Sequence, residues 1–394
     1  MLETRRCDVL RIVNIEVRKK SHQRRGTRLR LNTIQAVFCI LVFILIQPSV
    51  LSLASPAVRT VTLDSFETFP VILKRQFASF QTNPTAEVNE IRILCERIKQ
   101  RYVDFKWNPA AEGCGTKTHW RTNLKSHLGN SLLWAEFGTG SNTTLILGGV
   151  HPDEITPIPL AFRFAEHLAS NPGLVPSDAK VIVAPLINPD GFFRNLTSRT
   201  NSNGVDLNRN LFTRDWYGNA KSWWNQKRQN NPKHFPGHIP NSEIETLFQI
   251  WLIDQYKPDK IISIHAPLGF YDYDGPGERT KIMLTSSEEK AKKLVHAMSN
   301  HSQNYKIVDY SFYPGSLGNY AGIERGIPTI TLELETTNPK KIHDYWQQFS
   351  PGLTHAIQYP FKNAHSGQLQ GSSLFFDAYS RHVKADTAAS AKEF

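Results

Sequence analysis

Residues 144–154 have the sequence TLILGGVHPDE, in which an apolar run is followed by His151 and, three positions later, by Glu154. The run at 144–148 is typical of a buried β-strand, because it is short and apolar. An imidazole and a carboxylate at the carboxyl end of such a strand can converge on one metal ion. The pair alone is weak support for a metal site, since most pairs with this spacing are accidental neighbours on a protein surface.

A third candidate ligand follows another apolar run. Residues 260–264 are predicted to form a second buried strand, and His265 comes directly after it. In α/β proteins, ligands bind beyond the carboxyl ends of the parallel strands. Catalytic zinc sites combine three nitrogen or oxygen ligands with one open position. His151, Glu154 and His265 therefore form a candidate set, although a strand-end histidine without further support is more often structural.

Strand and helix patterns alternate along most of the chain. Strands are predicted at 132–137, 144–148, 180–187, 260–264 and 328–335, and helices at 88–103, 157–169, 242–256, 287–302, 317–324 and 340–357. Strands that are apolar on both faces favour a parallel sheet that is covered on both sides. We expect an α/β fold, with a single domain at 57–361 built on a mixed, largely parallel central sheet flanked by helices on both faces. Residues 214–238 are expected to form a long surface loop, and residues 362–394 a flexible C-terminal tail.

The basic charge of the chain is concentrated at its amino terminus. Residues 1–54 contain ten of the 46 Lys and Arg residues but only three of the 35 Asp and Glu residues, so this leader carries most of the net charge of +11. The rest of the chain is nearly balanced, and nucleic acid is therefore not expected as a partner. A basic stretch, an apolar run at 36–46 and small residues at Ser52 and Ala54 are typical of a signal peptide at 1–54, cleaved after Ala54.

The leader predicts export, to the periplasm or to the medium. Its apolar run is shorter than the ~20 residues that a membrane span needs, so no stable span is expected after cleavage. Retention of the leader as an amino-terminal anchor is the alternative. Export permits a disulfide between Cys95 and Cys114, because oxidising compartments preserve disulfides. The sequence equally allows two unpaired thiols in a small core.

Further motifs follow the two candidate strands. Residues 188–191 read NPDG, residues 199–210 read RTNSNGVDLNRN, and residues 329–335 read TITLELE. In this order, and together with His151, Glu154 and His265, they resemble the zinc carboxypeptidases (carboxypeptidase A-like) over about residues 130–345. The segments 314–320 and 326–334 are most similar to the bacterial murein peptide amidase branch of that family.

The resemblance implies a metal site with a polar surround. His151, Glu154 and His265 would bind one zinc ion per chain, and Asp206 would orient the imidazole of His151. Arg199 would stabilise the oxyanion that forms during hydrolysis.

The resemblance also implies residues that hold the substrate. Asn208 and Arg209 would bind its terminal carboxylate, a task that suits the planar guanidinium group. Without the resemblance, these two residues would be interpreted as a capped turn with a surface ion pair. A tyrosine is expected near the Gly-Ser element at 315–316, and both Tyr310 and Tyr313 qualify.

The general base is expected on the last predicted strand. Glu333 and Glu335 alternate with apolar residues, so both are predicted to project from one face. The resemblance favours Glu333, with Glu335 as the alternative. The peptide Ala266-Pro267 follows the third ligand, where the family commonly has a non-proline cis bond, and we predict that it is cis because an X-Pro bond adopts this form at low cost.

The resemblance to the murein branch implies the substrate. Members of that branch cut the γ-D-glutamyl–diaminopimelate bond of cell-wall peptides, so the expected partner is a murein tripeptide with a free carboxylate. Residues 268–277 would line the pocket, or else form an aromatic turn over the sheet. Two alternatives remain: an N-acyl amino acid deacylase resembling succinylglutamate desuccinylase, and a non-catalytic pseudo-peptidase that binds murein peptides.

Overall fold

The structure is a computed structural model that describes residues 84–108, 112–276 and 285–361. The predicted signal peptide at 1–54, its cleavage after Ala54 and the predicted tail at 362–394 lie outside these residues. Within the described ranges, no helix combines the length and the apolar composition that crossing a bilayer requires.

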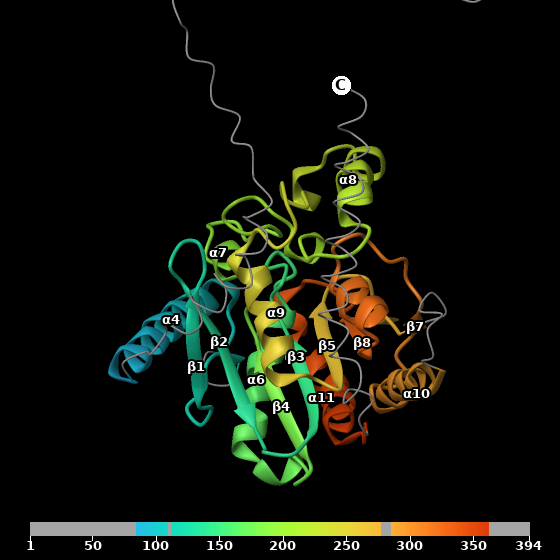
Figure 1. Cartoon of the computed structure of the whole chain (residues 1–394). Coiled ribbons are helices and arrows are strands. Elements are labelled where there is room, and N and C mark those ends of the chain that lie inside the picture. The colour runs from blue at the N-terminus through green and yellow to red at the C-terminus, as the bar shows by residue number, and fades with distance from the viewer. Residues whose placement is uncertain (1–83, 109–111, 277–284, 362–394) are drawn as a thin grey trace, which may run out of the picture. The chain divides into compact units, whose positions relative to one another are not determined.

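The described residues form one mixed sheet of eight strands (Figure 1). In chain order these strands are β1 (Trp120–Lys125), β2 (Ser131–Phe137), β3 (Asn142–Leu147), β4 (Ala179–Ala184), β5 (Lys260–His265), β6 (Phe270–Tyr273), β7 (Ile307–Val308) and β8 (Thr329–Glu333). Their spatial order is β1-β2-β4-β3-β5-β8-β6-β7. The central strands β4, β3, β5 and β8 are parallel to one another, whereas β2 and β6 flank them in antiparallel orientation. The predicted mixed, largely parallel sheet is therefore confirmed.

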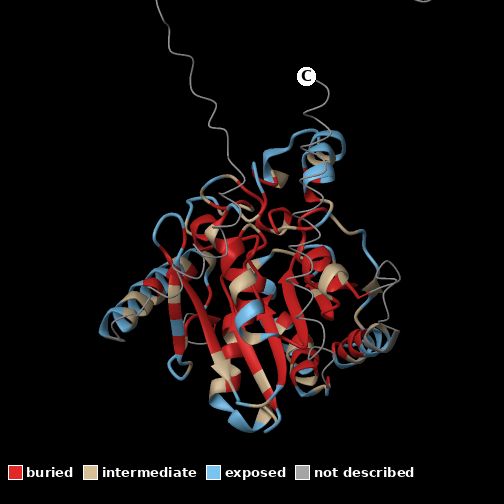
Figure 2. Cartoon of the chain, viewed as in Figure 1, coloured by how far each residue is buried: buried red, intermediate tan, exposed pale blue. Residues whose placement is uncertain are grey.

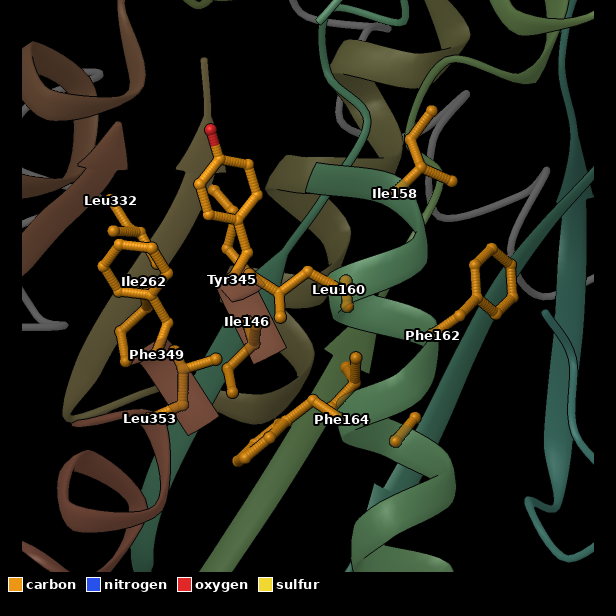
Figure 3. Close-up of a cluster of buried hydrophobic side chains, with 14 of the residues drawn as sticks. Ile146, Ile158, Leu160, Phe162, Phe164, Ile262, Leu332, Tyr345, Phe349 and Leu353 are labelled. Carbon is orange, nitrogen blue, oxygen red and sulfur yellow. The ribbon is translucent and has the colours of Figure 1, made fainter. Parts of the chain in front are cut away.

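Helices cover one face of the sheet with a continuous apolar core. These helices are α4 (Pro84–Phe105), α6 (Pro157–Ser170), α10 (Thr285–His301) and α11 (Ile342–Gln358). Figure 3 shows Phe164 of α6 and Phe349 of α11 in one cluster with Ile146, Ile262 and Leu332 of the central strands. Each such side chain contributes roughly 1.5–3 kcal/mol when it is fully buried.

A second core covers the opposite face. There, α9 (Ile244–Tyr256) and the π-helix η5 (Gly318–Ile323) pack against alternate side chains of β2, β3, β4 and β5. Both faces of the central strands are consequently buried (Figure 2). This double burial explains the continuous apolar runs of the sequence, and it confirms that helices flank the sheet on both sides.

The structure differs from the sequence-based expectations in one predicted loop and in three strands. Residues 214–238, predicted as a loop, contain the helices η3 (Trp216–Ala220), α8 (Lys221–Arg228) and η4 (Pro232–His234). α8 buries none of its residues, so it lacks the apolar periodicity by which helices are detected. The strands β1, β6 and β7 were not expected. Residues 268–277 were interpreted as pocket lining or as an aromatic turn; residues 270–273 form β6, so the turn interpretation is wrong, and Tyr271 and Tyr273 join the first core.

A disulfide between Cys95 and Cys114 ties α4 to the segment before β1, which resolves the two interpretations of this pair. The bridge closes a sequence separation of 19 residues. Replacing both cysteines by serine is expected to lower the free energy of unfolding by about 3 kcal/mol, because the unfolded chain gains conformational freedom. Urea denaturation measures this change. Reductant should destabilise the unmodified protein to the same extent and leave the variant unchanged, and equal stabilities would contradict the prediction.

Candidate active site

His151 and Glu154 lie in the short loop between β3 and α6. The loop turns at Gly149, whose φ of +62° is a conformation that favours glycine. A Cβ at this position would also lie only 3.0 Å from Ile158. α6 then begins at Pro157. Proline suits the first position of a helix, because an N–H group there would have no acceptor within the helix. The loop thereby brings both polar side chains to the carboxyl end of β3.

The neighbouring strands bring two further side chains to the same edge of the sheet. His265 is the last residue of β5, and Glu333 is the last residue of β8. Because β5 and β8 are parallel and in register, these two residues lie directly beside each other. The parallel pairing of β3, β5 and β8 thus brings Glu333 to the same edge of the sheet as His265, 68 positions earlier, and His151, 182 positions earlier.

Three side chains converge closely enough to hold a metal ion. The ligand atoms of His151, Glu154 and His265 all lie within 4.8 Å of one another. Nδ1 of His151 is 3.0 Å from Glu154 Oε1 and 3.2 Å from Nδ1 of His265, which is 2.9 Å from Glu154 Oε2. All three residues are more than nine-tenths buried.

The outer nitrogens of the two imidazoles have their own partners. Nε2 of His151 lies 2.9 Å from Asp206 Oδ1, and Nε2 of His265 lies 3.0 Å from Ser263 Oγ. A carboxylate only accepts hydrogen bonds, so His151 donates from Nε2 to Asp206. The lone pair of its Nδ1 then faces Glu154 and His265. Electron pairs from two imidazoles and a carboxylate that face one point repel each other unless a cation lies between them. The donor set therefore fits a zinc ion.

Arg199 and Asp206 surround the three candidate ligands. The Arg199 guanidinium donates from Nε to Asp206 Oδ2 at 3.0 Å and from Nη1 to Glu154 Oε1 at 2.8 Å. Burial opposes ionisation of Asp206, but Arg199 and His151 hold its pKa well below its usual value. Likewise, His151 and His265 outweigh burial and keep the pKa of Glu154 well below its usual value. Both carboxyl groups are thus ionised at neutral pH.

Glu333 lies half-buried beside the three residues, and its surroundings distinguish it from Glu335. Burial, and then the charge of Glu154, raise the pKa of Glu333 to about 8. Its Oε2 is 3.5 Å from the backbone N of Leu268. Glu335 lies beyond the end of β8 and is exposed. The alternation that would have placed both glutamates on one face therefore ends at Glu333.

Asn208 and Arg209 lie in the short helix η2 (Leu207–Arg209), directly after Asp206, whose carboxylate contacts His151. Asn208 Oδ1 accepts a hydrogen bond of 2.7 Å from the backbone N of Leu317. Arg209 is 5% exposed and forms no ion pair with the described residues, so the interpretation as a surface ion pair is wrong. Burial lowers the pKa of Arg209 to about 10, and it stays protonated at neutral pH.

The two tyrosine candidates occupy different surroundings. The Tyr313 ring lies 4.4 Å from the Arg209 guanidinium and packs against Trp223 of α8, with 4.8 Å between ring centroids. Tyr310 is 39% exposed and packs against Phe270, with 5.9 Å between centroids. Tyr313 is therefore the one that contacts Arg209, while Tyr310 lies at the surface.

Sequence reasoning missed Ser263 and Trp223. Ser263 is two positions before His265 on the same face of β5, so strand alternation could have identified it. Trp223 lies in a helix that was expected to be loop, and no signal in the sequence connected it with Arg209. The predicted cis peptide Ala266-Pro267 is confirmed.

Comparisons with known proteins point to one family. Residues 111–351, more than half of the chain, match the zinc carboxypeptidase family, Peptidase_M14. The chain is 32% identical to murein peptide amidase A of Vibrio campbellii over 216 residues, which cover 53% of this chain and 77% of that protein. It is 34% identical to murein peptide amidase A of Escherichia coli (strain K12) over 150 residues, which cover 36% of this chain and 57% of that protein.

Solved structures include a protein with a related name. The murein-tripeptide amidase MpaA from Escherichia coli O157 aligns with 65% of this chain and 98% of its own length, at 22% identity and a TM-score of 0.46. The named relatives confirm the resemblance to the murein peptide amidase branch that the sequence motifs indicated. On the strength of the match over residues 111–351, the chain is a hydrolase that belongs to the zinc carboxypeptidase family.

Proposed function

We propose that this chain is a zinc-dependent amidase that removes the terminal residue of a cell-wall peptide by cutting the γ-D-glutamyl–diaminopimelate bond. The observation that carries the proposal is the convergence of His151, Glu154 and His265 within 4.8 Å, with Glu333 beside them at the end of the neighbouring strand. Two buried imidazoles and a buried carboxylate, with a half-buried carboxylate beside them, are costly to maintain without a function.

His151, Glu154 and His265 are proposed to hold the zinc ion. When bound, zinc supplies Lewis acidity that polarises the scissile carbonyl and strengthens water as an acid. Asp206 is proposed to orient His151 by accepting its Nε2–H, and Ser263 occupies the corresponding position beside His265.

Glu333 is proposed as the general base. It would take a proton from the attacking water and pass it to the leaving nitrogen. Arg199 already uses Nε and Nη1 on Asp206 and Glu154, and its remaining N–H groups are proposed to stabilise the oxyanion, a contribution often worth ~3–4 kcal/mol per donor.

Asn208 and Arg209 are proposed to hold the free carboxylate of the substrate. Since Oδ1 of Asn208 already accepts from Leu317, its amide nitrogen is left with two donors that have no partner among the described residues. Arg209 Nε is buried and also lacks a partner there. Tyr313 lies against Arg209 and is proposed to help to position that carboxylate, with Tyr310 at the rim.

The cell wall as the place of action is part of the proposal. The relatives are named as murein peptide amidases, and the leader at 1–54 has the pattern of a signal peptide. The disulfide between Cys95 and Cys114 is also typical of an exported protein. We therefore propose a periplasmic or secreted enzyme that meets murein peptides directly.

Zinc-loaded protein is expected to release diaminopimelate from purified murein tripeptide and to leave N-acyl amino acids intact. Mass spectrometry of the products, with and without a zinc chelator, measures this. Turnover of the N-acyl amino acids alone would identify a deacylase instead. Binding of the tripeptide without turnover would identify a pseudo-peptidase.

A further inference from the structure

The positive charge of the chain beyond the leader is concentrated in one segment. Residues 55–394 contain 36 of the 46 Lys and Arg residues and 32 of the 35 Asp and Glu residues. Residues 214–238 alone contain five Lys and Arg residues and a single acidic residue, Asp215. This segment therefore carries the whole positive excess of residues 55–394, and the remainder of that range is balanced.

The centre of the basic segment is the exposed helix α8. None of its residues is buried, and none belongs to either apolar core. Figure 2 shows α8 in the colours of exposed and intermediate residues. Among the described residues, no carboxylate forms an ion pair with its cations Lys221, Lys227 and Arg228. These positive charges are therefore available to a negatively charged partner.

α8 reaches the candidate active site through Trp223. The Trp223 ring packs against that of Tyr313, with 4.8 Å between centroids. The Arg209 guanidinium lies 4.4 Å from the Tyr313 ring and 5.3 Å from the Trp223 ring. The Arg228 guanidinium lies 5.0 Å from Trp223 and 5.9 Å from Tyr313. Both arginines thus lie against the same two rings, which attract cations through their π-electrons.

The two arginines lack a negative partner among the described residues. Nε of Arg209 and Nε of Arg228 are both buried, and neither has a hydrogen-bond partner there. Burial is the largest cause that lowers the pKa of Arg209 to about 10, and the charges of Arg199 and Arg228 act in the same direction. A carboxylate that bound beside the two rings would offset the repulsion between these cations.

We infer that α8 is a docking surface for anionic peptides, on which Arg228 binds a second carboxylate beside the one proposed for Arg209. The inference rests on the proposed function, in which Asn208 and Arg209 hold the terminal carboxylate. Murein tripeptide has two further carboxylates, one on its γ-linked D-glutamate and one on the side chain of diaminopimelate. Lys221 and Lys227 would attract such a peptide over a longer range.

Peptides that differ by a single carboxylate test the inference, with kcat/KM at low salt as the readout. Lysine in place of diaminopimelate removes only the side-chain carboxylate, and amidation neutralises the α-carboxylate of D-glutamate. The unmodified zinc-loaded protein is expected to process at least one of these peptides about tenfold more slowly than murein tripeptide, as for a lost hydrogen bond to a charged group. In Arg228→Gln, this difference should shrink to about threefold or less.

The dependence on ionic strength is a readout that a change in packing would not move. Between about 0.01 M and about 1 M salt, the distance over which charges act falls from about 30 Å to about 3 Å. For the unmodified protein, kcat/KM for murein tripeptide should fall about tenfold over this range, through KM and not through kcat. The combined variant Lys221→Gln, Lys227→Gln and Arg228→Gln should lose most of this dependence.

The matched control combines Arg92→Gln, Lys99→Gln and Lys106→Gln. It also removes one arginine and two lysines from exposed positions, on α4 and directly after it. Figure 1 shows α4 beside β1, away from α8. Its peptide preference and salt dependence should match those of the unmodified protein. Equal kcat/KM for all three peptides, or a salt dependence that the α8 variant retains, would overturn the inference.

Calorimetry separates this inference from the proposed function. If none of the peptides is hydrolysed, the proposed function fails, but tighter binding of murein tripeptide to the unmodified protein than to Arg228→Gln would still support the docking surface. Equal binding would overturn it. Sedimentation with phosphatidylglycerol vesicles tests a lipid surface as the partner. If vesicle binding is lost in the α8 variant while peptide binding is unchanged, α8 docks to lipid and the inference is wrong.

Discussion

The variant Glu333→Gln is expected to lose hydrolysis almost completely, by at least ~10³-fold in kcat, while it still binds one metal ion. General acid–base catalysis contributes about 10²–10⁴-fold, and glutamine can neither accept the proton from water nor return it to the leaving nitrogen. The three candidate ligands His151, Glu154 and His265 are untouched by this change. Steady-state turnover of murein tripeptide and metal analysis of the same sample measure both halves of the prediction.

Glu335→Gln is the control for this experiment. Glu335 is exposed and lies beyond the last residue of β8, so its substitution should leave turnover within about twofold, as for most surface changes. If Glu335→Gln were inactive and Glu333→Gln active, the assignment of the base would have to move to Glu335. Full activity of Glu333→Gln would remove the proposed base altogether.

Loss of the metal is the second change with a large expected effect. In His265→Ala, two of the three ligand side chains remain, and zinc affinity should fall far enough that the purified protein holds much less than one ion per chain. Activity should fall by at least ~10³-fold, because neither the carbonyl nor the water would be activated. Elemental analysis and turnover measure these outcomes, and a chelator should reproduce them in the unmodified protein.

Thermal unfolding gives this prediction a readout that does not depend on activity. A ligand that binds only the folded state stabilises it by about 2.7 kcal/mol at one hundred times its dissociation constant. Zinc should therefore raise the unfolding temperature of the unmodified protein and have little effect on His265→Ala. His301→Ala, at an exposed histidine of α10, should behave like the unmodified protein. A zinc response that survives in His265→Ala would contradict the proposed ligand set.

The contribution of the sequence to these predictions is uneven. The apolar runs before His151 and His265 predicted two buried parallel strands, and β3 and β5 confirm both. Strands of this kind can be recognised in the sequence, because a strand that is buried on both faces is apolar along its whole length. α8 was missed for the opposite reason, since a helix that buries no residue has no apolar face to detect.

By itself, the sequence determined the chemistry that the chain has available. It contains two imidazoles and an acid at strand ends, a glutamate on a late strand, and an Asn-Arg pair in a recognisable order of motifs. Only the tertiary structure decided which of these groups meet. The parallel register of β5 and β8 puts Glu333, and not Glu335, beside His265.

Asp272 and Asp274 show this limit most clearly. In the sequence, Asp272 and Asp274 belong to an aromatic stretch that could be either pocket or turn. Asp272 lies opposite Thr331, two positions before Glu333, only because β6 pairs antiparallel to β8, a strand more than fifty residues away in sequence. Pairings of this kind follow from packing over the whole sheet and not from local preference. The residue types therefore come from the sequence, whereas their neighbours come from the fold.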